Sequence, residues 1–98
     1  MFNIFELTQA DTKTLQERAL KLCEEAGELA QAVLSATGAP GSGYKNHSLA
    51  DVREEAVDAA IVALSVLAQA NTSKEEFERE LEHLMSEKCA KWQQKLAK

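Results

Sequence analysis

Apolar residues recur at steps of three and four along the first third of the chain, which is the spacing of one face of an α-helix. The positions are Leu15, Ala19, Leu22, Ala26, Leu29 and Val33. We expect a cap for this helix at Thr8 or Asp11, because Thr8 followed by Asp11 resembles a capping box. The helix should end at 35–37, ahead of Gly38.

One loop and two further helices are expected after it. The only proline and three of the four glycines fall together, so residues 37–48 form the predicted loop. Residues 51–70 form a second helix, in which 56–68 are apolar almost without interruption. A third helix should start at a cap on Thr72 or Ser73, and no alternating β-branched run predicts a strand. The fold class is therefore all-α.

The second helix also predicts assembly of several chains. A helix that is apolar on all sides must be covered on all sides, and 98 residues supply too few helices for this. Residues 1–7 are too apolar for a solvated tail and should pack on the bundle or on a neighbouring chain. We expect a single domain over residues 1–98, an antiparallel helical bundle with four-helix cores completed by oligomerisation, in a homodimer or homotetramer.

Charge and composition exclude several classes of function. The formal net charge of −5 argues against a nucleic acid polymer as partner, because phosphate backbones are bound by clustered lysine and arginine. A single nucleotide remains open, since a cation can bridge phosphates to carboxylates. No apolar run has the length of a membrane span, and the first residues do not resemble a signal peptide. Cys23 and Cys89 indicate reduced thiols in a cytoplasmic protein.

Asp58 interrupts the apolar stretch of the second helix, one turn after Glu55. An unpaired carboxylate in apolar surroundings costs several kcal/mol, so such groups are paired or bind metal. On the first helix, Glu24, Glu25 and Glu28 share a sector beside the apolar stripe. Antiparallel packing would bring acids of both helices together, and such a group of oxygen ligands suits Mg²⁺.

The acids also have flanking residues that resemble a known family. The pattern is Glu25-x-x-Glu28, a gap of 26 residues, then Glu55-x-x-Asp58, within the segments KLCEEAGEL and EEAVD. This pattern resembles the MazG-like all-α nucleoside triphosphate pyrophosphohydrolases, a superfamily that includes dimeric dUTPases and phosphoribosyl-ATP pyrophosphatases. The resemblance covers roughly residues 15–68.

The resemblance implies an activity and a role for each acid. The expected reaction is hydrolysis of (deoxy)nucleoside triphosphates to monophosphate and pyrophosphate, in nucleotide-pool house-cleaning. The implied Mg²⁺ ligands, which would also accept Mn²⁺, are Glu25, Glu28, Glu55 and Asp58. Glu24 is the implied catalytic acid that orients ligands or water. A metal of this kind neutralises phosphate charge and lowers the pKa of a bound water.

The triphosphate also needs positive side chains, and a base needs a surface to stack on. The candidates are Lys45, Arg53, Lys88, Lys91 and Trp92. For the four basic residues the alternative is a solvated surface position, and for Trp92 it is packing in the apolar stripe of the third helix.

Two alternatives remain open. Within the enzyme class, the substrate is phosphoribosyl-ATP or dUTP instead of a general triphosphate. Outside it, the chain is a non-catalytic acidic helical module, such as an adaptor or antitoxin-like dimer, whose acids would be exposed on solvated helix faces. Asp58, inside an apolar helix, favours the enzyme.

Overall fold

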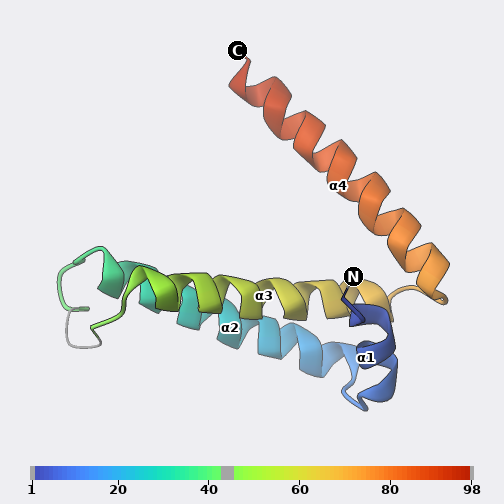
Figure 1. The fold of residues 1–98 in the computed structure, drawn as a ribbon, viewed down its shortest axis with the longest axis horizontal. Coiled ribbons are helices and arrows are strands. Elements are labelled where there is room, and N and C mark those ends of the chain that lie inside the picture. The colour runs from blue at the N-terminus through green and yellow to red at the C-terminus, as the bar shows by residue number, and fades with distance from the viewer. Residues whose placement is uncertain (1, 43–45, 98) are drawn as a thin grey trace.

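The computed structural model describes residues 2–42 and 46–97, and in these residues the chain forms helices only (Figure 1). The helices are α1 (Ile4–Ala10), α2 (Leu15–Ala36), α3 (Leu49–Gln69) and α4 (Lys74–Leu96). The all-α fold class predicted from the sequence is confirmed.

Short polar motifs fix where the long helices begin. The Thr14 hydroxyl accepts from the backbone N–H of Glu17, and the Glu17 carboxylate accepts from the N–H of Thr14. Ser48 and Asp51 form the same capping box at the start of α3. Ser73 caps α4, as one of the two predicted residues. Gly38 has a φ of 76°, the left-handed conformation that ends helices, so α2 ends where expected.

The predicted cap of the first long helix is wrong, because a separate short helix precedes it. Thr8 lies inside α1, where its hydroxyl donates to the carbonyl of Ile4 at 2.7 Å. Asp11 is the residue after the last turn of α1. The capping box that starts α2 is formed instead by Thr14, the residue just before Leu15, and by Glu17 in the first turn of the helix. Of the first residues, Ile4 and Phe5 pack on the other helices as expected, whereas Phe2 and Leu7 are exposed.

α2 and α3 lie side by side as an antiparallel hairpin, with α1 at the end opposite the loop (Figure 1). α4 leaves that same end and projects away from the hairpin, so it contacts α1 and α3 only near its start and does not contact α2. Its anchor is a cluster of Phe5, Ala68 and Phe77, in which the two phenyl rings are 6.0 Å apart. Ile4, Leu67 and Leu81 pack around this cluster.

The chain buries little of its apolar surface. Its accessible surface is 7428 Å², whereas a compact monomer of 10.8 kDa exposes about 5,500 Å². Its radius of gyration is 16.2 Å, against about 13 Å for a compact domain of this length. In the described residues no large side chain is fully buried.

One side of the hairpin is free of charge. The residues of this side, which we call the apolar face, are all exposed: Leu15, Ala19, Cys23, Ala26, Ala30 and Val33 of α2 with Ala56, Ala60 and Ala63 of α3. The predicted apolar stripe of α2 is therefore divided. Leu22 and Leu29 turn toward α3 and are partly buried, and the remainder of the stripe stays open to solvent.

Candidate metal centre

Three carboxylates meet where α2 packs against α3. One oxygen of each of Glu25, Glu28 and Glu55 lies within 4.8 Å of the others. Glu25 is buried, Glu55 is half-buried and Glu28 is exposed. The Oε2 atoms of Glu25 and Glu55 are buried and have no hydrogen-bond partner in the described residues. Buried polar atoms are normally satisfied, so these two oxygens are open to a further partner such as a cation or a water molecule.

Helix periodicity brings the trio together. Glu25 and Glu28 are one turn apart on α2, and residues at that spacing share a helix face. Glu55 lies near the start of α3, whose register is set by the capping box at Ser48. Gly27, between the two α2 acids, faces open space, so a close contact within this chain does not explain a residue that costs a helix about 1 kcal/mol.

The electrostatics of the group are unfavourable without a cation. The charge of Glu25 is the largest cause that raises the pKa of Glu28. Loss of solvation and the charges of Glu55 and Glu24 raise it further. Among the residues that the structure describes, Lys21 is the ammonium that contacts these acids: its Nζ lies 3.3 Å from an oxygen of Glu24 and 3.3 Å from an oxygen of Glu25, and these contacts raise its own pKa. One positive charge thus faces four negative ones.

Asp58 does not join the trio. It lies one turn beyond Glu55 on the same side of the hairpin as Glu28, and its side chain is exposed. The expectation that Asp58 is buried in apolar surroundings is wrong for this chain, because α2 covers only one side of α3. Its role as a fourth ligand stays a prediction.

The predicted catalytic and substrate-binding residues lie at various distances from the trio. Glu24 is exposed beside it, held by Lys21. Arg53 is exposed near the start of α3. Lys88, Lys91 and Trp92 lie on the part of α4 that projects away from the hairpin, and Trp92 is 66% exposed. Lys45 is outside the described residues.

Sequence reasoning missed a cleft beside the acids. It has a volume of about 570 Å³ and lies between α1, the first half of α2 and the second half of α3. Apolar residues such as Leu7, Leu20 and Ile61 line it. Lys21 and Glu24 line it as well, and Lys21 also contacts Glu25, so the cleft ends next to the three acids.

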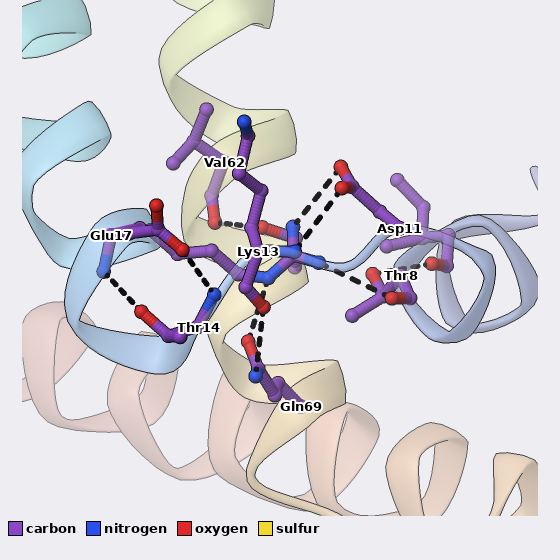
Figure 2. A network of polar contacts seen from close by, with 10 residues as sticks. Thr8, Asp11, Lys13, Thr14, Glu17, Val62 and Gln69 are labelled. Carbon is purple, nitrogen blue, oxygen red and sulfur yellow. Dashed lines mark hydrogen bonds and ion pairs between the residues drawn. The ribbon is translucent and has the colours of Figure 1, made fainter.

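A buried arginine organises the walls of this cleft (Figure 2). Arg18 Nε donates to Gln69 Oε1 at 2.6 Å, and Nη2 donates to the carbonyl of Thr8 at 3.2 Å. Its Nη1 lies 4.0 Å from a carboxylate oxygen of Asp11, and Gln69 donates in turn to the carbonyl of Lys13. One side chain of α2 thus holds α1, the following linker and the end of α3 together. The spacing of apolar residues in the sequence does not identify a buried arginine such as Arg18.

No family model, curated protein or solved structure matches this chain in the comparisons made. Among the described helices, none is long and apolar enough to cross a membrane. A functional assignment therefore depends on the site itself and on the acid motif.

Proposed function

We propose that this chain hydrolyses (deoxy)nucleoside triphosphates to monophosphate and pyrophosphate with the help of Mg²⁺. The observation that supports this most is the pair of buried, unpartnered carboxylate oxygens of Glu25 and Glu55, with Glu28 beside them. Oxygen-only ligands from carboxylates suit a hard cation such as Mg²⁺ or Mn²⁺. The resemblance of the acid motif to the MazG-like family supplies the reaction class.

Each acid has a distinct part in this proposal. Glu25 and Glu55 hold the cation from the buried side, and Glu28 and Asp58 complete the ligand set from the solvent side. When bound, the cation offsets the phosphate charge and makes a water molecule more acidic. Glu24 lies at the border between the acids and the cleft, where its carboxylate accepts the proton of the attacking water. The two serines near His47 have structural roles: Ser35 Oγ accepts from the backbone N–H of His47, and Ser48 caps α3, so neither argues for a covalent intermediate.

The cleft accounts for the remainder of a nucleotide. Its volume of about 570 Å³ lies within the usual range for small-molecule sites, and its walls are mostly apolar. With the phosphates directed to the acids, the nucleoside lies against Leu7 and Leu20, and Lys21 lies at the junction. The substrate is therefore a nucleotide, and not pyrophosphate or a phosphomonoester alone.

Assembly as a homodimer or homotetramer belongs to the same proposal. The apolar face carries no charge, and two such faces packed together would give a four-helix core. The chain exposes about 1,900 Å² more than a compact monomer would. A stable interface needs about 800 Å² from each partner, so one or two interfaces fit this excess.

A second candidate is an acidic helical adaptor without catalysis. The exposure of Glu24, Glu28 and Asp58 favours it, since exposed acids on helices are common without a metal. The two candidates differ in what the buried oxygens require. An adaptor gains nothing from Mg²⁺, whereas the enzyme depends on it.

The deciding experiment is turnover of a panel of NTPs and dNTPs with Mg²⁺ or EDTA. We expect monophosphate and pyrophosphate with Mg²⁺ only. Glu55→Gln should abolish turnover, and Glu54→Gln, the adjacent exposed acid outside the trio, should keep it. In ¹⁸O-water the label should enter the monophosphate. Turnover in EDTA, or release of diphosphate and free phosphate, would exclude this reaction.

A further inference from the structure

The chain has an acidic pole on the hairpin. We call it the acidic face, and it consists of the exposed residues Glu24, Glu28 and Asp58, with the exposed apolar residues Val57 and Ile61 beside them. Val57 is 55% exposed and Ile61 is 47% exposed, so the face offers apolar contact as well as negative charge. Below it lies Glu25, only 8% exposed, with one oxygen unpartnered.

The opposite pole lies on the projecting half of α4. We call residues 85–96 the arm. Its apolar stripe is Met85, Cys89, Trp92 and Leu96, all exposed. A basic stripe of Lys88, Lys91 and Lys95 runs beside it, and these three lysines outnumber the one acid of the arm, Glu87. The arm therefore pairs apolar contact with positive charge, which complements the acidic face.

The two poles do not meet within one chain. The arm contacts neither α2 nor the acidic face, because α4 is held at its start by Phe77 against Phe5 and Ala68 (Figure 1). Trp92 is 66% exposed and forms a continuous exposed stripe with its apolar neighbours on the arm, and such a patch indicates an interaction surface.

We propose that the arm of a second copy of this chain packs on the acidic face and contributes Lys88 and Lys91 to the active site. By two-fold symmetry each chain then gives an arm and receives one. Trp92 and Met85 of the arm cover Val57 and Ile61. The lysines lie above the carboxylates, where they bind substrate phosphates. This role of the lysines rests on the proposed function, whereas the docking of the arm does not.

The exposed area permits this contact in addition to pairing through the apolar face. The excess of about 1,900 Å² per chain exceeds the roughly 800 Å² of one standard interface. The two surfaces are on different parts of the molecule, so both can be covered in a dimer of dimers. Attraction between opposite charges also sets the orientation of the arm.

Cross-linking tests the docking without any activity. In a Cys23→Ser background, Cys89 of the arm is the remaining native thiol. Val57→Cys or Ile61→Cys should then form a disulfide between chains under mild oxidation, seen as a dimer on a non-reducing gel with Cys89 identified by peptide mass spectrometry. Disulfides need Cα atoms within about 7 Å. Cys23→Ser alone is the control and should stay monomeric on that gel.

Charge reversal is a second test of the contact between the arm and the acidic face. Lys88→Glu with Lys91→Glu should weaken assembly in sedimentation velocity, because like charges then face each other. Arg79→Glu is the control for each single reversal: it reverses one charge on the opposite side of α4 and should leave assembly intact, whereas Lys88→Glu alone should already weaken it.

Mixed subunits test whether the lysines act in trans. Glu55→Gln and the double lysine variant should each be inactive alone. Mixed one to one, they should recover about one quarter of wild-type activity, since half of the dimers are hybrids with one complete site each. The proposal would be overturned if the mixture recovers no activity and if neither Val57→Cys nor Ile61→Cys forms a disulfide between chains. If the wild type turns over no nucleotide, the proposed function fails, and cross-linking still decides the docking.

Discussion

Replacing Glu55 by glutamine should change the stability of the protein in opposite directions with and without metal. The substitution removes one charge and keeps the size of the side chain. Oxygens of Glu25 and Glu55 lie within 4.8 Å, and two unit charges at that distance repel by about 1 kcal/mol in water and about 3.5 kcal/mol at an effective dielectric constant of 20. Glu55 is half-buried, so relief of roughly 1–2 kcal/mol is expected. In EDTA, the variant should therefore be more stable than the wild type.

Magnesium should reverse this order. A ligand that binds only the folded state stabilises it by about 2.7 kcal/mol at one hundred times its Kd. The wild type gains this stabilisation, and Glu55→Gln, which lacks a buried ligand oxygen, gains little. In a chain of this length, 1 kcal/mol corresponds to about 4–8 °C in Tm, so the crossing is easily measured by circular dichroism. Protein concentration is held constant, because assembly also contributes to Tm.

The neighbouring substitution Glu54→Gln is the control, since Glu54 is exposed and outside the trio. It should leave both the Tm in EDTA and the shift with Mg²⁺ close to those of the wild type. A Glu55→Gln variant that melts lower in EDTA, or one that gains as much from Mg²⁺ as the wild type, would refute the metal centre.

Three further substitutions test other parts of the structure. Arg18→Met removes two hydrogen bonds from a buried guanidinium, so it should cost about 2–4 kcal/mol in urea unfolding, whereas the exposed Arg79→Met should cost almost nothing. Ala26→Glu places a charge on the apolar face and should dissociate the assembly in sedimentation; an intact oligomer would argue against that interface. The raised pKa of Glu28 means that, in EDTA, the wild type loses stability as the pH rises above the ordinary carboxyl value. Glu28→Gln should lack this loss, so a stability difference that is constant between pH 4 and 8 would contradict it.

The sequence predicted the helical elements well because their signals are local. The long helices, the loop between them and the cap at Ser73 all depend on residues a few positions apart. The separate helix α1 was missed because its seven residues are too few to show a period. The capping box at Thr14 was overlooked because Thr8 and Asp11 have the same three-residue spacing.

The site was predicted only as far as helix periodicity reaches. Glu25, Glu28 and Glu55 come together because two amphipathic helices packed antiparallel leave little choice. The exposure of Asp58 and the outward direction of α4 depend on how much surface the remainder of the molecule covers. The amount of covered helix surface depends on the packing of distant elements and of partner chains, so no local sequence pattern predicts it. The contacts of Arg18 span 51 residues to Gln69, which is likewise beyond local reasoning.

The capping boxes have a consequence for the order in which the protein is made. Thr14 with Glu17, and Ser48 with Asp51, each close within three residues, so both helix starts are specified before any distant contact forms. Helices form in about a microsecond, and a hairpin of two helices has low contact order, so it closes early. Joining of chains is then the slow, second-order step of folding in the assembly proposed above. Each newly synthesised hairpin therefore waits with its apolar face open for a time that shortens as copies accumulate.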